Sequence, residues 1–169
     1  MSSRGKYVNE NRALEEAIKA AKRSPCSKSK RGVVLWCPEI YCSLTLGWNH
    51  PPEPMFCDGS EACRESCGKL CVHAEADALI NAQHNVDGYS MLHVKVADGE
   101  AVPSGPPSCW QCSRLLLGAK IKKVWLLHEE GLKLYTARDF HEQTLKNCGL
   151  PAILPALEES PPEKRPLGF

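Results

Sequence analysis

The sequence predicts an α/β domain in which helices pack on one central sheet. Amphipathic helical patterns alternate along the chain with short strand-like runs. The 169 residues suit one compact domain and are too few for two independent cores. Hydrophobic residues make up 43% and charged residues 24%, close to globular averages, which excludes a mostly disordered chain.

The expected elements follow from hydrophobic period and from capping residues. In chain order they are a helix at 9–23, strands at 32–37 and 41–48, a helix at 73–85, a strand at 89–97, a helix at 108–118, a strand at 121–127, a short strand at 132–135 and a helix at 136–147.

In the first half, the opening helix has apolar residues at i, i+3, i+4 and i+7, with Asn9 or Asn11 as its cap. The two expected strands at 32–37 and 41–48 flank Pro38 and Glu39, and this arrangement predicts a hairpin. Residues 49–72 show no clean period and contain four cysteines. A loop of that length is usually functional or held by something.

The second half continues the alternation of helix and strand. Residues 98–107 are rich in glycine and proline and predict a loop. Ser108 is expected to cap the helix that follows and Gly118 to end it. Thr136 is expected to cap the last helix.

We expect a single domain over residues 1–150 and a proline-rich C-terminal tail over residues 151–169. Lys+Arg 21 against Asp+Glu 20 gives a formal net charge of +1, which argues against nucleic acid as the partner. No apolar run approaches the ~20 residues of a membrane span. No secretory signal is visible at the start, so we expect a cytoplasmic protein with no membrane partner.

The ten cysteines are the unusual feature of the composition. In a reducing compartment, clustered cysteines more often bind metal or take part in chemistry than form disulfides. Two clusters are present, one being Cys57, Cys63, Cys67 and Cys71, and the other the CxxC pair Cys109 and Cys112.

The pattern His73-Ala74-Glu75 precedes the CxxC pair, and each part lies at the expected start of a helix. Thiolates there gain from the positive end of the helix dipole. Two thiolates and the His73 imidazole leave the fourth position of a tetrahedral zinc open for water. Glu75, in the same first turn, can reach that water and a substrate, which matches the zinc-deaminase pattern. A structural zinc or a chance match is the alternative.

These residues resemble the cytidine/deoxycytidylate deaminase superfamily, and most of all the dCMP deaminases, over about residues 9–148. The segments 71–75 and 109–115 resemble its two zinc motifs, and 47–49 resembles its glycine–aromatic–asparagine segment. Three positions depart from the family pattern, namely His50, Asp77 and Ser108.

The resemblance implies a three-layer α/β/α domain with one central, mostly five-stranded mixed sheet. It implies hydrolytic deamination of a free pyrimidine nucleotide, dCMP + H2O to dUMP + NH3, with zinc-activated water and Glu75 as the proton shuttle. Other substrates stay open: cytidine, dCTP, guanine, a modified dCMP, tRNA or single-stranded DNA. A zinc-stabilised binding module without activity is a further alternative, and a homo-oligomer is implied.

The resemblance also implies a second, structural zinc. Its expected ligands are Cys26, Cys57, Cys63 and Cys67, with Cys71 as a replacement for Cys63 or Cys67. Free thiols or adventitious disulfides are the alternative.

The expected substrate contacts are the Asn49 amide to a sugar hydroxyl, the Ala74 backbone N–H to the base, and pocket walls from Trp48, Ser108 and Trp110. The basic run 28–31 is open to two interpretations, as a contact for a mononucleotide phosphate or for nucleic acid. The remaining histidines are interpreted as surface or satisfied core residues: His84, His93, His128 and His141.

Overall fold

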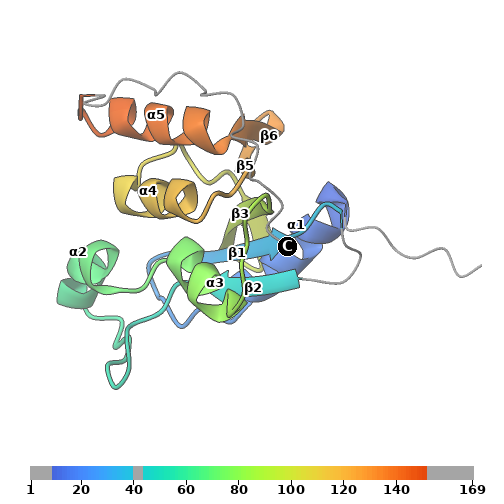
Figure 1. Ribbon diagram of the computed structural model, residues 1–169. Coiled ribbons are helices and arrows are strands. Elements are labelled where there is room, and N and C mark those ends of the chain that lie inside the picture. The colour runs from blue at the N-terminus through green and yellow to red at the C-terminus, as the bar shows by residue number, and fades with distance from the viewer. Residues whose placement is uncertain (1–8, 40–43, 152–169) are drawn as a thin grey trace, which may run out of the picture.

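The computed structural model of the chain describes residues 9–39 and 44–151 (Figure 1). The helices are α1 (Glu10–Lys22), α2 (Glu61–Leu70), α3 (Ala74–Ala82), α4 (Trp110–Gly118) and α5 (Ala137–Asn147). The strands are β1 (Lys30–Trp36), β2 (Leu44–Trp48), β3 (Ser90–Ala97), β4 (Glu100–Val102), β5 (Lys123–His128) and β6 (Gly131–Thr136). None of the helices within these ranges has both the length and the apolar character of a membrane span.

One mixed sheet organises the domain. Its strand order is β2-β1-β3-β5-β6, and the short β4 pairs with β3 beside this path. The β3–β5 pair is parallel, while the other pairs are antiparallel. The predicted α/β class, with one central and mostly five-stranded mixed sheet, is therefore confirmed.

Helices cover both faces of this sheet, because successive strand residues point to opposite sides. Val34 and Leu92 pack with α1 on one face. Val33 and Met91 pack on the other face with residues of α3, α4 and α5. Figure 1 shows α1 and α3 on opposite sides of the strands, which gives three layers.

Two elements were not expected from the sequence. Helix α2 lies inside the segment 49–72 that we expected to be a loop, and β4 lies inside the expected loop 98–107. Helix α2 has no buried residue, so it lacks the apolar stripe that reveals a helix in a sequence. Its start is marked by Ser60, whose side chain accepts a hydrogen bond from the Cys63 N–H at 3.1 Å.

Other boundaries differ in detail. The N-cap of α1 is Asn9, and the N-cap of α4 is Cys109 rather than the expected Ser108. Residues 40–43, where the second strand was expected to begin, lie outside the described residues. So do residues 1–8 and 152–169, which include nearly all of the expected C-terminal tail.

Gly47 lets α3 approach the sheet closely. It lies in β2 opposite Val33, and a Cβ at this position would overlap the Ala74 carbonyl oxygen and the Ala78 amide of α3. That Cβ would also lie 2.7 Å from Ala78 Cα. Because both sides of this contact are backbone, neither can move aside without displacing the helix that begins beside His73.

The substitution Gly47→Ala is therefore expected to destabilise the fold by about 1–3 kcal/mol or more through overpacking. Gly118→Ala is the matched control, since a Cβ there meets nothing within 4 Å. We expect the control to be neutral or stabilising by up to about 1 kcal/mol. Urea unfolding of both variants measures the difference, and equal midpoints would contradict the close-packing account.

Candidate functional site

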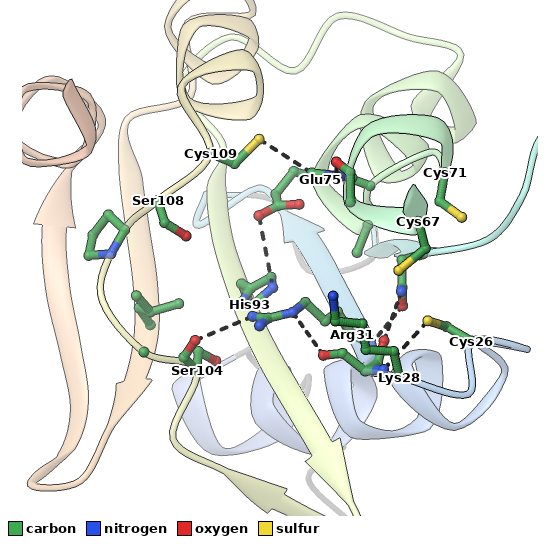
Figure 2. Close-up of a pocket in the computed structure, with 18 of the residues that line it drawn as sticks. Cys26, Lys28, Arg31, Cys67, Cys71, Glu75, His93, Ser104, Ser108 and Cys109 are labelled. Carbon is green, nitrogen blue, oxygen red and sulfur yellow. Dashed lines mark hydrogen bonds and ion pairs between the residues drawn. The ribbon is translucent and has the colours of Figure 1, made fainter. Parts of the chain in front are cut away.

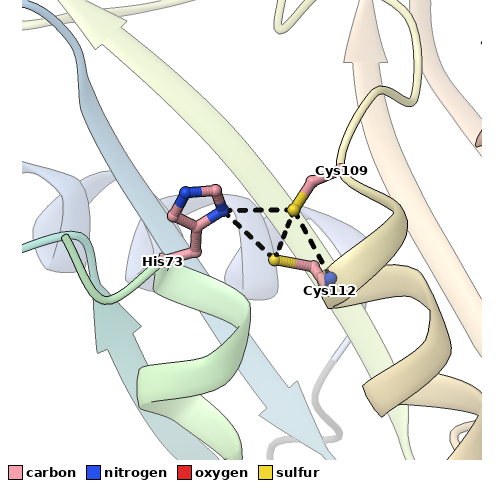
Figure 3. A group of neighbouring side chains, drawn as sticks. All are labelled: His73, Cys109 and Cys112. Atoms are coloured by element: carbon pink, nitrogen blue, oxygen red, sulfur yellow. Dashed lines mark hydrogen bonds between the residues drawn. The ribbon is translucent and has the colours of Figure 1, made fainter. Parts of the chain in front are cut away.

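The first turns of α3 and α4 meet at three side chains, His73, Cys109 and Cys112 (Figure 3). The two sulfurs lie 3.1 Å apart, and His73 Nδ1 lies 3.2 Å from Cys112 Sγ and 3.3 Å from Cys109 Sγ. His73 and Cys109 are the N-cap residues of their helices, and both have extended backbone conformations. The segments 73–75 and 109–112, far apart in the chain, therefore form one cluster.

This cluster can hold a metal ion. The three ligand atoms all lie within 4.8 Å of one another, and two thiols with an imidazole are a donor set that zinc prefers. His73 Nε2 lies 2.9 Å from the Gly68 carbonyl oxygen. Because a carbonyl only accepts, that bond fixes the proton on Nε2 and turns Nδ1 toward the sulfurs, as outer partners of ligating histidines do.

Without a metal, the three side chains of this cluster differ in pKa and therefore in protonation. The hydrogen bond with Cys112 lowers the pKa of Cys109 to about 5. His73 acts in the same direction, and burial acts against it. The hydrogen bond with Cys109, opposed by burial, raises the pKa of His73 to about 9. The neighbouring Cys109 and burial both raise the pKa of Cys112. Near neutral pH, Cys109 is thus a thiolate, while His73 and Cys112 each hold a proton that a metal must displace.

Glu75 lies two residues after His73 in the first turn of α3, and only 13% of its side chain is exposed. Burial opposes ionisation of this carboxyl group. The imidazole of His93, the local backbone N–H, His73 and Arg31 outweigh burial, so that the pKa of Glu75 lies below its ordinary value. The site therefore holds an ionised carboxylate beside the metal-ligand cluster.

Both groups face one cavity of about 250 Å³, of the order of a single small-ligand site (Figure 2). Its walls include His73, Glu75 and Cys109, together with the cationic side chains Lys28 and Arg31. Arg31 is held by hydrogen bonds from Nε to Ser29 Oγ at 3.2 Å and from Nη1 to the Ser104 carbonyl oxygen at 3.3 Å.

Three of the expected substrate contacts line this cavity, namely Asn49, Ala74 and Ser108. The Asn49 side-chain amide also has a structural use. Its Oδ1 accepts a hydrogen bond from the backbone N–H of Arg31 at 2.7 Å, and its Nδ2 donates to the Ser29 backbone carbonyl at 2.8 Å. One amide hydrogen and one lone pair of Asn49 are left for a ligand.

The two tryptophans lie outside the residues that line the cavity. Trp48 is covered by the Arg23 guanidinium at 5.2 Å from the ring centroid, and Trp110 is covered by Arg114 at 4.8 Å. Adjacent residues of a strand or helix turn point in different directions, so Asn49 and Cys109 can line the cavity while Trp48 and Trp110 do not.

The second group of cysteines comes together more loosely. Cys57 Sγ lies 3.6 Å from Cys63 Sγ, and Cys26 and Cys67 interact with each other. Cys26, Cys67 and Cys71 also line the cavity. Within residues 9–39 and 44–151, the cluster of His73 with the CxxC pair is the one group whose ligand atoms all lie within 4.8 Å of one another.

The departures from the family pattern at His50 and Asp77 are in contact with each other. Asp77 Oδ1 lies 3.2 Å from His50 Nε2, and Asp77 Oδ2 accepts from the Trp48 N–H at 3.0 Å. Asp77 thereby ties the end of β2 to α3, the helix that presents Glu75.

Sequence reasoning gave no site role to His93, which lines the cavity from β3. Its Nε2 lies 3.8 Å from Glu75 Oε1. A histidine within an apolar strand was the available signal, but one residue of this type in a strand is more often an ordinary core residue.

Comparison with known proteins places this geometry in a known fold. No protein-family model matches the chain, and no curated protein matches its sequence. Solved structures do match. They include a cytidine deaminase from Burkholderia pseudomallei, with a TM-score of 0.57, 20% identity, and coverage of 79% of this chain and 96% of that one.

Two further structures agree with this fold assignment. A dCMP deaminase from the cyanophage S-TIM5, in complex with dCMP and dUMP, gives a TM-score of 0.53 at 22% identity over 85% of this chain and 96% of that one. A cytidine deaminase from Mycobacterium tuberculosis gives 0.52 at 18% identity over 78% and 93%. The chain has the three-layer fold that these cytidine and dCMP deaminases share.

Zinc binding is expected to depend on pH, since His73 and Cys112 must each release a proton to the solvent. The affinity should rise as pH rises toward the His73 pKa of about 9, by about tenfold per pH unit for each proton released. Competition titrations with a chelator of known affinity at about pH 6 and about pH 8 measure this slope. An affinity that stays constant over this range would contradict the proton assignment.

Proposed function

We propose that the chain catalyses zinc-dependent hydrolytic deamination of a free pyrimidine nucleotide, with dCMP + H2O giving dUMP + NH3. One observation carries the proposal: the carboxyl group of Glu75, whose side chain is only 13% exposed, faces the same cavity as the His73 and Cys109 metal ligands. A structural metal site has no use for a carboxylate that is not a ligand, whereas a hydrolytic site needs a group to move protons.

His73, Cys109 and Cys112 would hold the zinc, which supplies when bound a water acidic enough to react at neutral pH. Glu75 accepts the proton that this water gives up and transfers it to ring N3 of the base. Oxygen adds to C4 as a hydroxyl group. Glu75, again a carboxylate, takes the proton of that hydroxyl and passes it to the exocyclic nitrogen, which leaves as ammonia while the C4 carbonyl forms. The Ala74 backbone N–H and the Asn49 amide, both at the cavity wall, are proposed to orient the base and the sugar.

Two cationic side chains in the wall of the cavity support a substrate that carries a phosphate. Lys28 and Arg31 line it, and Arg31 has N–H donors beyond the two that bind Ser29 and Ser104. A guanidinium fork beside an ammonium suits a terminal phosphate. A cavity of about 250 Å³ and a net charge of +1 favour a mononucleotide over a nucleic-acid strand.

We further propose a structural zinc on Cys26, Cys57, Cys63 and Cys67, with Cys71 as a replacement for Cys63 or Cys67. The proximity of Cys57 to Cys63 and of Cys26 to Cys67 supports this proposal. Such a metal would fix α2, which has no buried residue of its own, at the wall of the cavity.

The number of zinc ions bound per chain tests this second site. About two ions per chain support the structural site, and one ion per chain contradicts it.

The cell compartment and the assembly are also proposals. All nine cysteines within the described residues are free, which supports a reducing compartment such as the cytoplasm. Ile80 of α3 and Trp110 and Leu115 of α4 are large apolar residues exposed to solvent, which supports a homo-oligomer formed through these helices.

The proposed function is tested by assaying the zinc-loaded protein on dCMP, with dCTP, cytidine, deoxycytidine and guanine alongside. We expect turnover of dCMP that falls by at least about 100-fold in Glu75→Ala, because the proton shuttle is removed. Glu129→Ala, which changes an exposed glutamate, is the matched control and should keep full activity. Zinc content should be equal in all three proteins.

Bound zinc without turnover of dCMP would overturn the assignment of this substrate. Turnover of another of these compounds would keep the mechanism and change the substrate. Activity that persists in Glu75→Ala would overturn the mechanism itself.

A further inference from the structure

His93 lies in the middle of β3, at the centre of the sheet. It is paired with Val33 of β1 on one side and with Leu126 of β5 on the other. Its side chain is 5% exposed and lies on the sheet face covered by α3, beneath Glu75 (Figure 2). Because hydrogen-bonded neighbours hold its backbone on both sides, the imidazole occupies a rigid place in the floor of the cavity.

The two ring nitrogens of His93 have unequal surroundings. Nε2 faces Glu75 Oε1 at 3.8 Å, whereas Nδ1 is buried with no hydrogen-bond partner among the described residues. The proton-accepting carboxylate that the proposed function assigns to Glu75 can only accept, so the nitrogen that faces it has to carry the proton. Nδ1 then carries a lone pair and no hydrogen. The ring N–H faces an acceptor in this tautomer, instead of being buried without one.

The charge state of His93 agrees with this geometry. Burial lowers its pKa to about 4, with Arg31 and His73 acting in the same direction and Glu75 opposing them. The ring is neutral near pH 7 and can donate from Nε2 without adding a charge to the cavity. An ordinary core histidine would have both nitrogens paired, so this arrangement needs another explanation.

Glu75 has few other ways to be held in place. The side chains that act on its carboxylate are His93 on β3, Arg31 on β1, Cys112 on α4 and His73 at the N-cap of α3. His73 and Cys112 belong to the metal-ligand cluster, and Arg31 is held by Ser29 and Ser104 and is proposed to bind the phosphate with its other donors. His93 is left as the uncommitted donor beneath the carboxylate.

We propose that His93 is a positioning residue for Glu75: its Nε2–H donates to Glu75 Oε1 and keeps the other carboxylate oxygen turned toward the substrate. The inference rests on the proposed function, because it concerns the group that moves protons there. The 3.8 Å separation is longer than a hydrogen bond, and such contacts commonly shorten when a substrate excludes water.

Kinetics of two variants test this role. In His93→Leu we expect kcat for dCMP to fall by about 10- to 100-fold, as for other outer partners of metal-site groups, with little change in KM or zinc content. In His93→Gln, whose amide N–H can reach the same oxygen, we expect much of this loss to be restored. His128→Leu is the matched control, since His128 pairs with the Tyr135 hydroxyl at 2.9 Å instead of with Glu75.

Equal losses in His93→Leu and His93→Gln, or no loss in either, would overturn the positioning role. Thermal unfolding of each variant separates a loss of kcat from a loss of folded protein.

A second measurement does not depend on activity. Long-range 1H–15N spectra of histidine-labelled protein report which ring nitrogen of His93 carries the proton. We expect a neutral ring protonated at Nε2 near pH 7, and resonances that move in Glu75→Gln. A ring protonated at Nδ1, or resonances unaffected by Glu75→Gln, would overturn the inference. If the protein has no deaminase activity, the proposed function fails while these spectra still decide the contact between His93 and Glu75.

Discussion

The contact between the first turns of α3 and α4 is the interaction on which the rest of the site depends. It needs two helices to begin within a few ångströms of each other, and the surrounding structure fixes both starts. Helix α3 is placed by its backbone contact with Gly47 of β2. The approach to α4 is placed by the end of α5, where Asn147 Nδ2 donates to the Pro107 carbonyl at 2.7 Å and Cys148 Sγ donates to the Ser108 carbonyl at 3.2 Å. The packing of all three helices on one sheet face therefore determines the geometry of His73 and the two cysteines.

The cavity beside this contact is electrically polar. An ionised Glu75 and the Cys109 thiolate line it together with the cations Lys28 and Arg31. A buried carboxylate is costly unless neighbours compensate it, and here His93, the local backbone and His73 do so. A ligand with a neutral, proton-accepting ring and a remote anionic group matches this polarity. That match is the physical basis for proposing a pyrimidine nucleotide.

The sequence predicted the parts of this account that depend on local spacing. His73, Glu75, Cys109 and Cys112 are close in the chain within each motif, so one helix start suffices to place each pair. His93 reaches the cavity through strand register, which brings β1 and β3 together across some sixty residues of chain and leaves no local pattern. Arg31 belongs to the basic run 28–31, which the sequence offered as a contact for a phosphate. Helix α2 escaped prediction because it buries nothing. The tryptophans beside the motifs were expected at the cavity, but sequence neighbours in a strand or helix turn point in different directions.

The central claim is that His73, Cys109 and Cys112 form a single metal centre beside Glu75. An anomalous-difference map, recorded at the zinc absorption edge from a crystal of the protein grown with zinc, tests it most directly. The account predicts a peak between the two sulfurs and His73 Nδ1, with Zn–S distances of about 2.3 Å and a Zn–N distance of about 2.0–2.1 Å. A map with no peak at these three atoms would contradict it.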